Sequence, residues 1–275
     1  LLSDPDVNHA RHCLQELDLL IVQDLFLTET AQIADVVLPG ASYAEKEGTF
    51  TGTDRRVQRV RKAIEPVGDS RPDWQIICDL AQEMGAHGFD FESASEVMDE
   101  IASVTPIYGG VSYERLGELG SLQWPLPGTP YLHRGRFSRG QGQFHAIPFM
   151  EAQELPDEEY TYILTTGRMM FHFHTGSMTR RTDKLEQEVS EAYVEIHPRD
   201  ARQIGLNGSG RVRVTSRRGQ IELAARVTRN IRPGVVFIPF HFGEAAANVL
   251  TNSALDPIAK IPEYKVCAVK IEPVS

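Results

Sequence analysis

The sequence has few cysteines, and none lies in a recognisable metal-binding or redox motif. Of its 275 residues only Cys13, Cys78 and Cys267 are cysteines, and no two are close enough to form a C-x-x-C pair. An odd number of widely spaced thiols does not indicate a disulfide framework. Such cysteines are typical of small, partly buried side chains in a reducing compartment. A cytoplasmic location is therefore expected, and the chain carries no recognisable iron–sulfur motif of its own.

The sequence also lacks a long apolar run, an export signal and a basic surplus. No apolar stretch approaches the roughly 20 residues that a membrane-spanning helix needs. The N-terminus lacks the basic, apolar and small-residue succession of a secretory signal. The formal net charge of −10 argues against a dedicated nucleic-acid surface. We therefore expect no membrane span and no nucleic-acid partner.

The length of the chain and its first residue bear on domain organisation. A chain of 275 residues is near the upper size of a single hydrophobic core, so two domains are predicted. Hydrophobic residues make up 41% and charged residues 24%, which is ordinary for a globular protein. Because the sequence begins at Leu1 and not at a methionine, we expect it to be one piece of a larger polypeptide.

The first half of the chain alternates strand and helix patterns. A continuous apolar run over 17–22 predicts a strand that is buried on both faces of a parallel sheet. A short helix is predicted over 28–34, with the Thr28 hydroxyl available as its cap, and a second strand over 35–39. Strand, helix and strand in quick succession indicate an α/β layer. Apolar spacing predicts two more helices, over 74–84 and 93–104.

The second half has the pattern of a small β-barrel. Irregular sequence from 105 to 156, rich in Gly, Pro and aromatic residues, separates it from the first half and is the natural domain boundary. A short helix beginning at Pro198 interrupts the strands, and Gly219 lies in a hairpin turn. Many short strands favour a closed barrel, which has no free edge. The predicted strands cover 160–165, 193–196, 211–216, 220–227 and 235–240.

One loop concentrates functional groups. The apolar residues 162–164 run into a turn at Gly167, and an arginine, two histidines, an aromatic ring and several hydroxyls follow by residue 181. A core strand does not need this mixture, whereas a loop that holds a large, polar, anionic ligand does. Gly167 permits close backbone approach, and Arg168 supplies a fixed fork of donors suited to a pyrophosphate. His172 and His174, two positions apart, form an alternative metal pair, although no third ligand is near.

This loop resembles the pterin-contacting loop of molybdopterin-dependent oxidoreductases, particularly the formate dehydrogenase branch. Segments 21–39, 45–51 and 71–74 are similar to the family's third domain, which holds one guanine nucleotide arm. Segments 165–179, 248–251 and 262–269 are similar to the last domain of formate dehydrogenase catalytic subunits. The match is collinear and covers almost the whole chain.

The resemblance implies a fold of the α/β plus β class and a large cofactor. A partial dinucleotide-type α/β domain that binds a guanine nucleotide occupies 1–105, an irregular connection 106–157, and a double-psi β-barrel that binds molybdopterin dinucleotide 158–275. The implied ligand is a bis-molybdopterin guanine dinucleotide that carries molybdenum or tungsten. Residues from both halves are expected to contact it.

The resemblance also implies which residues bind this cofactor. They are Asp24, Thr28, Lys46, Asp73, Gly167, Arg168, Met169, His172, Phe173, His174, Thr175, Phe240, Asn248, Tyr264 and Lys265. A carboxylate such as that of Asp73 can accept two hydrogen bonds from the N1–H and N2–H₂ groups of guanine. The amide of Asn248 can both donate to and accept from the edge of a pterin ring.

Each assignment has a structural alternative. Asp24 and Asp73 are also ordinary helix caps, and Lys46 and Lys265 are also ordinary surface lysines. Phe240 is also an ordinary core aromatic. Either histidine of the loop can instead be satisfied by a backbone carbonyl, and the basic cluster over 55–62 can be a solvated face or a contact with another domain.

The residues that would carry the chemistry have no counterpart in this chain. Formate oxidation in the family uses a metal-ligating cysteine or selenocysteine, a neighbouring histidine, an arginine and the cysteines of a [4Fe-4S] cluster, all in upstream segments. We therefore predict no catalytic residue and no metal ligand here, and no activity of this piece alone. The implied partners are the N-terminal portion of the same catalytic subunit, iron–sulfur electron-transfer subunits and the substrate formate.

Two other functions remain open on the sequence. Another molybdopterin oxidoreductase such as a nitrate reductase shares the same cofactor shell. A non-catalytic subunit of an NADH dehydrogenase-like complex keeps the fold without the pterin. The polar loop over 167–181 is also expected to be mobile without cofactor, because its polar groups would have no partner.

Overall fold

The structure, a computed structural model, describes residues 1–137, 139–206 and 208–274. The chain forms two compact units, which we describe separately. Unit 1 comprises Leu1–Leu20, Leu27–Asp35 and Pro148–Ser275, and unit 2 comprises Ile21–Phe26 and Val36–Ile147. Across the described ranges, no helix is both long and apolar enough to cross a bilayer. The three cysteines are free thiols.

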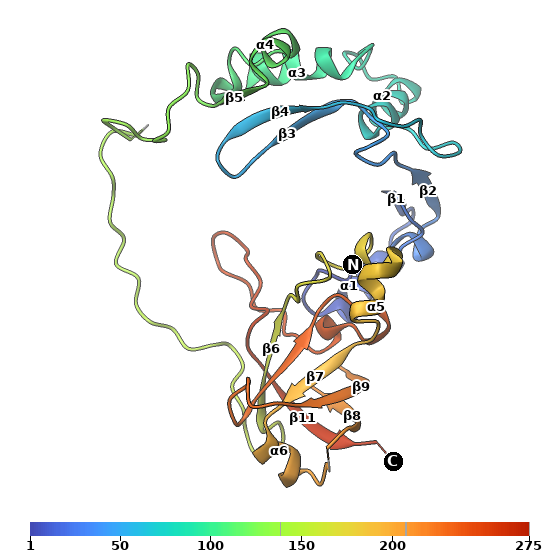
Figure 1. Cartoon of the computed structure of the whole chain (residues 1–275), viewed down its shortest axis with the longest axis vertical. Coiled ribbons are helices and arrows are strands. Elements are labelled where there is room, and N and C mark those ends of the chain that lie inside the picture. The colour runs from blue at the N-terminus through green and yellow to red at the C-terminus, as the bar shows by residue number, and fades with distance from the viewer. Residues whose placement is uncertain (138, 207, 275) are drawn as a thin grey trace. The chain divides into compact units, whose positions relative to one another are not determined.

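In its described residues, unit 2 combines two small sheets with three α-helices and the 3-10 helix η2 (Pro106–Tyr108). Strands β1 (Ile21–Asp24) and β2 (Val36–Pro39) pair in parallel, with Asp24 opposite Pro39 at their carboxyl ends. An antiparallel sheet consists of β3 (Gly48–Thr51), β4 (Arg56–Val60) and β5 (Ser121–Gln123). Helices α3 (Ala94–Val104) and α4 (Tyr113–Leu119) run along one side of the β3–β4 hairpin, and α2 (Asp73–Glu83) lies near the end of the hairpin (Figure 1). The buried core of the unit consists of Val57, Met98, Val111, Leu116 and Leu122.

The predicted helices of unit 2 are confirmed by their end signals. Helix α2 ends just before Gly85, whose φ of 76° is a conformation that favours glycine. Helix α3 begins after Ser93, whose hydroxyl accepts a hydrogen bond from the Glu96 backbone N–H at 3.3 Å. Local capping chemistry therefore marks the end of α2 and the start of α3.

Two expectations for unit 2 are wrong. The first strand begins at Ile21 rather than at residue 17, and it is not buried on both faces. Ile21 is 41% exposed, and Val36 of the neighbouring strand β2 is 40% exposed. The reason is that β1 and β2 form a sheet of only two strands in the described residues. Residues 113–123, expected to be irregular, form α4 and β5. Ser112 caps α4 through the Arg115 N–H, and Leu116 is buried in the core.

Unit 1 is built around a closed barrel, as the sequence predicts. Within its described residues, six strands close in the order β10-β6-β11-β8-β9-β7. The pairs β6–β10 and β7–β9 are parallel, and β8 is antiparallel to both β9 and β11. Fully buried side chains such as Leu164, Val194, Val212, Val236 and Ile238 fill its interior. The strands are β6 (Tyr162–Gly167), β7 (Tyr193–Ile196), β8 (Gly210–Thr215), β9 (Gln220–Val227), β10 (Val235–Pro239) and β11 (Cys267–Pro273).

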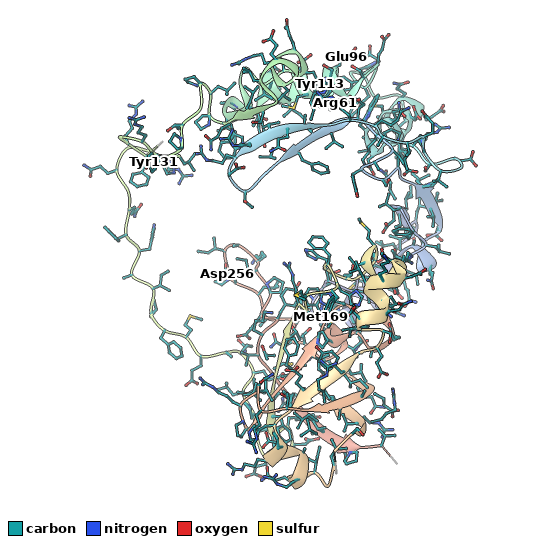
Figure 2. All side chains as sticks on the ribbon, in the orientation of Figure 1. Arg61, Glu96, Tyr113, Tyr131, Met169 and Asp256 are labelled. Carbon is teal, nitrogen blue, oxygen red and sulfur yellow. The ribbon has the colours of Figure 1, made fainter. Side chains whose placement is uncertain are left out.

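Short helices and loops connect the strands of unit 1. The helices are α1 (Val7–Gln15), η1 (Ala31–Ile33), η3 (Thr179–Arg181), α5 (Asp183–Glu188), α6 (Pro198–Gln203), η4 (Gly243–Ala245) and η5 (Ala247–Val249). The helix predicted after Thr28 is reduced to the 3-10 turn η1, and the Ala31 N–H donates to the Thr28 hydroxyl at 3.4 Å. Met169 marks the loop that follows β6, and Asp256 marks the loop before β11 (Figure 2).

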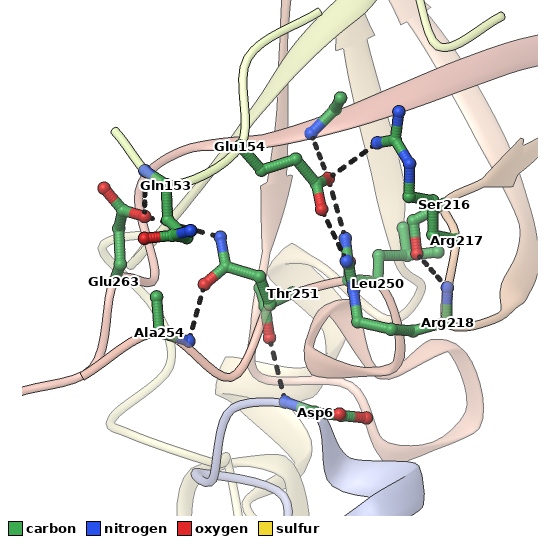
Figure 3. Close-up of polar contacts among 12 residues, drawn as sticks. Asp6, Gln153, Glu154, Ser216, Arg217, Arg218, Leu250, Thr251, Ala254 and Glu263 are labelled. Carbon is green, nitrogen blue, oxygen red and sulfur yellow. Dashed lines mark hydrogen bonds and ion pairs between the residues drawn. The ribbon is translucent and has the colours of Figure 1, made fainter. Parts of the chain in front are cut away.

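A polar network fastens the segment before β6 to the barrel (Figure 3). The Glu154 carboxylate accepts hydrogen bonds from both terminal nitrogens of Arg218, at 2.6 and 2.9 Å, and from the Ala268 N–H at 2.7 Å. Arg218 also donates to the Leu250 carbonyl through Nε and Nη2, at 3.0 and 2.9 Å. Burial opposes ionisation, but these donors outweigh it and hold the pKa of Glu154 below 4.5. Glu154 therefore joins this segment to β11 and to the β8–β9 turn.

Candidate functional site

Unit 1 contains a pocket of about 560 Å³ beside the loop that follows β6. Six of the predicted ligand-binding residues line it. None of the lining residues that the structure describes is acidic, whereas Arg168 and Lys265 are cationic. The pocket therefore suits an anionic or electron-rich ligand rather than a cation. It is lined by Ser3, Thr166, Arg168, His174, Phe240, Asn248, Tyr264 and Lys265.

Hydrogen bonds to backbone carbonyls fix one wall of this barrel pocket. The Thr166 hydroxyl, at the end of β6, donates to the Tyr264 carbonyl at 2.8 Å, and the Lys265 ammonium donates to the Thr166 carbonyl. The Tyr264 hydroxyl donates to the Ser3 carbonyl at 2.6 Å. Burial, together with the nearby Asp4 carboxylate, raises the pKa of Tyr264 above 10, so its phenol stays neutral. Lys265 is thus tied to β6, unlike an ordinary surface lysine.

Asn248 and Phe240 complete the wall from the loops after β10. Asn248 is buried, its amide N–H₂ donates to the Leu2 carbonyl at 2.8 Å, and its amide oxygen accepts from the Thr251 hydroxyl at 3.4 Å. Phe240 packs against the barrel core and also lines the pocket. It is therefore both a core aromatic residue and a residue that a ligand in the pocket could contact. An aromatic ring and an amide therefore accompany the two cations.

The two loop histidines differ in environment. His174 lines the pocket, adopts a φ of 50°, and places its Nε2 3.3 Å from Nη2 of Arg168. His172 is buried: its Nε2 donates to the Val189 carbonyl at 2.8 Å, and its Nδ1 accepts from the Thr179 hydroxyl at 3.3 Å. The backbone-carbonyl alternative thus describes His172. The metal-pair alternative has no support, because no group of three or more potential ligands occurs in the described part of the chain.

Other predicted residues of the loop lie outside the pocket lining that the structure describes. Met169 packs against the barrel core, and Phe173 is 65% exposed. The Thr175 hydroxyl is hydrogen-bonded to the Ser177 hydroxyl at 3.0 Å. At Gly167, a Cβ would approach a ring carbon of Phe237 to 2.6 Å, so the missing side chain makes room for the partly buried ring of Phe237 on the neighbouring strand β10. Their roles toward a ligand stay predictions.

The loop over 167–181 was expected to be mobile because its polar groups would have no partner. That reason is wrong, because several of these groups have protein partners. The Arg180 guanidinium pairs with Glu244 at 2.7 Å and with Glu186 at 3.1 Å, and it stacks over the Phe242 ring at 4.7 Å. The Thr179 hydroxyl also accepts from a backbone N–H at 3.1 Å. Gly176 has a φ of 73°, and a Cβ there would approach the Arg180 side chain to 2.7 Å. The loop is therefore held by its own contacts.

Sequence reasoning missed three residues of this region. Ser3 and Thr166 line the barrel pocket, but a serine and a threonine give no distinctive signal. His241 does not line the pocket, yet it contacts the loop behind it: the Met169 N–H donates to its Nε2 at 2.9 Å, and its Nδ1 donates to the His174 carbonyl. The usable signal was a histidine inside the apolar run 235–242, directly after the predicted Phe240.

Unit 2 contains a second pocket, of about 480 Å³, at the carboxyl ends of β1 and β2. Open α/β sheets hold ligands at this edge. Three predicted residues line it, namely Asp24, Lys46 and Asp73. The full lining is Gln23, Asp24, Leu25, Ala41, Ser42, Tyr43, Lys46, Glu47, Gly48, Thr49, Phe50, Val60 and Asp73.

Asp73 is the best-connected acid of this unit 2 pocket. Its Oδ1 accepts from the Gln23 side chain at 2.7 Å, and its Oδ2 pairs with the Lys46 ammonium. Burial opposes ionisation, but these two donors outweigh it and hold the pKa of Asp73 below 3.8. At Gly40 a Cβ would lie 3.2 Å from Asp73 Oδ1, so glycine leaves room for the carboxylate. Asp73 does not cap α2, and Lys46 is not an isolated solvated lysine.

The other residues predicted in the first half of the chain contact protein groups close to them in their own unit. Asp24 accepts from the following Leu25 N–H at 2.7 Å and does not cap η1, which begins at Ala31. Thr28 is buried in unit 1 and does not line either of the two pockets as the structure describes them. The basic cluster finds partners inside unit 2: Arg55 donates to two backbone carbonyls, and Arg59 pairs with Glu47 at 2.8 Å.

Comparison with known proteins assigns the family. Residues 1–83 match the molybdopterin oxidoreductase family model, and residues 162–268 match that of the molydopterin dinucleotide binding domain. The chain therefore belongs to the molybdopterin oxidoreductases. A relative is the F420-dependent formate dehydrogenase 1 subunit alpha of Methanococcus maripaludis, 54% identical over 99% of this chain and 41% of the relative. The F420-dependent formate dehydrogenase subunit alpha of Methanocaldococcus jannaschii is 50% identical over 99% of this chain and 42% of its own length.

A solved structure shares the fold. The acetylene hydratase from Pelobacter acetylenicus superimposes with a TM-score of 0.76 at 20% identity, over 98% of this chain and 42% of that one. The chain thus spans about two fifths of the length of these three proteins.

Proposed function

We propose that this chain is the C-terminal, cofactor-binding portion of a formate dehydrogenase catalytic subunit, which oxidises formate to CO₂ and two electrons. The observation that carries the proposal is that six residues chosen for their resemblance to pterin contacts line one pocket of the barrel. Identity of 50–54% to formate dehydrogenase alpha subunits over nearly the whole chain supports formate as the substrate.

The cofactor that we propose is a bis-molybdopterin guanine dinucleotide with molybdenum or tungsten. In the barrel pocket, Arg168 and Lys265 would bind phosphate and pterin oxygens, and the Phe240 and Tyr264 rings would contact the planar pterin. When bound, the metal–pterin group supplies the two-electron redox chemistry, and the protein supplies binding, orientation and electrostatics. The donor set fits this group because it is cationic, aromatic and free of acids in the described lining.

In unit 2, we propose that the pocket holds a guanine base. Each carboxylate oxygen of Asp73 has a second acceptor site besides its internal donor, which leaves room for the N1–H and N2–H₂ groups of guanine. The partly exposed Tyr43 and Phe50 provide aromatic surface beside it. Charge-assisted bonds of this kind contribute about 1.5–3 kcal/mol each.

The remaining parts of the assembly are also proposals. We infer that this piece alone is inactive, that a [4Fe-4S] cluster and the metal ligands belong to the N-terminal portion of the subunit, and that electrons leave through iron–sulfur partner subunits. The free cysteines support a reducing, cytoplasmic setting.

The proposal is tested by comparing the whole protein with this chain alone. We expect formate-dependent reduction of a viologen dye by the whole protein only, and release of guanine nucleotide when the whole protein is denatured. Nitrate-dependent oxidation of the reduced dye, without a response to formate, would reassign it as a nitrate reductase. A purified protein without guanine nucleotide would point to a non-catalytic subunit of an NADH dehydrogenase-like complex.

A further inference from the structure

His241 is a completely buried polar residue directly behind the barrel pocket. Its side chain has no solvent exposure and does not line the pocket. The ring centroid lies 4.9 Å from that of Phe240, 5.8 Å from that of His172 and 6.4 Å from that of Phe242. A buried imidazole needs partners for both ring nitrogens, because an unsatisfied polar atom in such a place is costly.

Both partners of His241 are backbone groups of the loop that follows β6. The Met169 N–H donates to Nε2 at 2.9 Å, and Nδ1 faces the His174 carbonyl. A backbone N–H only donates and a carbonyl only accepts, so the imidazole is fixed as the neutral form with its proton on Nδ1. A protonated ring would turn Nε2 into a donor and oppose the Met169 N–H.

The two hydrogen bonds hold the two ends of the stretch 169–174, and a residue that lines the pocket lies at each end. Met169 directly follows Arg168, and the carbonyl bound by Nδ1 belongs to His174 itself. Arg168 and His174 both line the pocket, with Nη2 and Nε2 3.3 Å apart. His174 has a φ of 50°, which is uncommon for a residue with a side chain and needs support from its surroundings.

We propose that His241 is a positioning residue for ligand binding: as a neutral imidazole it clamps the Met169 N–H and the His174 carbonyl, and so fixes Arg168 and His174 in the geometry that grips the anionic cofactor. This inference rests on the proposed function, because the ligand is the one proposed above. His241 does not touch the ligand; it acts through the loop.

The surroundings of His241 support the neutral form. Burial lowers the pKa of His241 below 6.5, the carbonyl of His174 opposes this, and the neighbouring His172, Arg168 and His174 lower the pKa further. Two of the rings that pack against His241 face other charged groups. Glu186 Oε2 lies 3.7 Å from Nε2 of His172, and the Arg180 guanidinium stacks over the Phe242 ring.

Two substitutions separate the two halves of the clamp. In His241→Asn the side-chain amide lies near the position of Nδ1, which keeps a donor for the His174 carbonyl and removes the acceptor for the Met169 N–H. In His241→Gln the longer amide lies near the position of Nε2, which keeps that acceptor and removes the donor. His197→Asn is the matched control, because the Nδ1 of His197 accepts from the Arg199 N–H at the start of α6 and an asparagine caps a helix equally well.

The experiment uses the whole protein as purified with its cofactor. We expect each His241 variant to retain guanine nucleotide and pterin roughly 5–10-fold less tightly on dialysis, as the loss of one buried hydrogen bond implies. Amide hydrogen exchange at Met169 should accelerate in His241→Asn and stay near the wild-type rate in His241→Gln. A purely structural role for His241 would raise exchange throughout the barrel and would not separate the two variants.

The inference is overturned if both variants keep the cofactor as tightly as the wild type, or if exchange at Met169 is the same in both. Equal loss of cofactor in His197→Asn would also overturn it. If the wild-type protein releases no guanine nucleotide, the proposed function fails, and exchange at Met169 still decides whether His241 clamps the loop.

Discussion

The barrel pocket of unit 1 and the pocket of unit 2 differ in the charge of the residues that line them. The barrel pocket presents Arg168 and Lys265 and has no acid among its described lining residues. The unit 2 pocket presents Asp24, Glu47 and Asp73, with Lys46 paired to one of them. A cationic wall selects a ligand rich in negative charge, whereas carboxylates select a ligand edge rich in N–H donors.

The two pockets also differ in how their charged groups are held. In the barrel pocket the Lys265 ammonium donates to a backbone carbonyl, and among the described residues it forms no ion pair that would neutralise its charge. The Tyr264 hydroxyl also donates to a backbone carbonyl. In unit 2 the Asp73 carboxylate is held by an opposite charge and an amide, so it stays ionised. A dinucleotide has both an anionic phosphate–pterin end and a base with a donor edge, which is why the contrast supports one ligand type for both pockets.

The largest expected effect is the loss of nucleotide retention when the Asp73 carboxylate of the unit 2 pocket is removed. Asp73→Ala removes both acceptors proposed for guanine and leaves Lys46 without its acid, so nucleotide retention should fall by about 100-fold or more, since two proposed bonds of about 1.5–3 kcal/mol are lost. Guanine nucleotide retained per polypeptide after dialysis measures it. Asp79→Ala is the control, because Asp79 lies on the same helix in an exposed pair with Arg71 at 2.8 Å. Equal retention in both variants would remove the unit 2 pocket from the site.

A smaller effect is expected from the cations of the barrel pocket. Arg168→Gln and Lys265→Gln should each weaken cofactor retention by about 10-fold, because each removes one positive charge that we propose to face an anionic group of the cofactor. The loss should shrink as salt rises, since screening already weakens the wild-type interaction. Arg213→Gln, which breaks an exposed pair with Glu222 at 2.6 Å on the same barrel, is the control. A loss that is independent of salt would argue for a role in packing instead.

The smallest effect is a difference in pH response between the two pockets. His241 has a pKa below 6.5, so the unfolded state takes up a proton first and the barrel loses stability as pH falls through about 6.5. Asp73 has a lowered pKa, so its contribution persists until pH falls below 3.8. Protection factors from hydrogen exchange at pH 7, 6 and 5, which allow for the slower intrinsic exchange in acid, should therefore fall first around Met169. A simultaneous fall in protection around Gln23 would contradict the assignment.

The sequence predicts the barrel well because its information is local. Alternating residues in 211–216 and 220–227 face the core and the solvent in turn, and Gly219 lies in the turn that pairs the two strands. Pro198 likewise begins α6 where expected. The resemblance then supplied the residues of the barrel pocket, because the motifs around Arg168, Asn248 and Lys265 are compact.

The contacts that the sequence did not predict join distant residues. Lys46 and Asp73 are 27 positions apart, and neither residue alone indicates the other as its partner. His241 is bonded to backbone atoms 72 and 67 positions away, and backbone atoms leave no trace in the residue pattern. Helix α4 was missed because its 7 residues form only about two turns, which give little periodicity, although Ser112 offered a cap.

The Glu154 network has a practical consequence for dissecting the molecule. A barrel that was cut to begin at residue 158 would lose Glu154, leaving the half-buried Arg218 without its acid and the Ala268 N–H without an acceptor. Residues 148–157 therefore belong to the folded body of the barrel, and any attempt to isolate it should cleave the chain on the N-terminal side of Pro148.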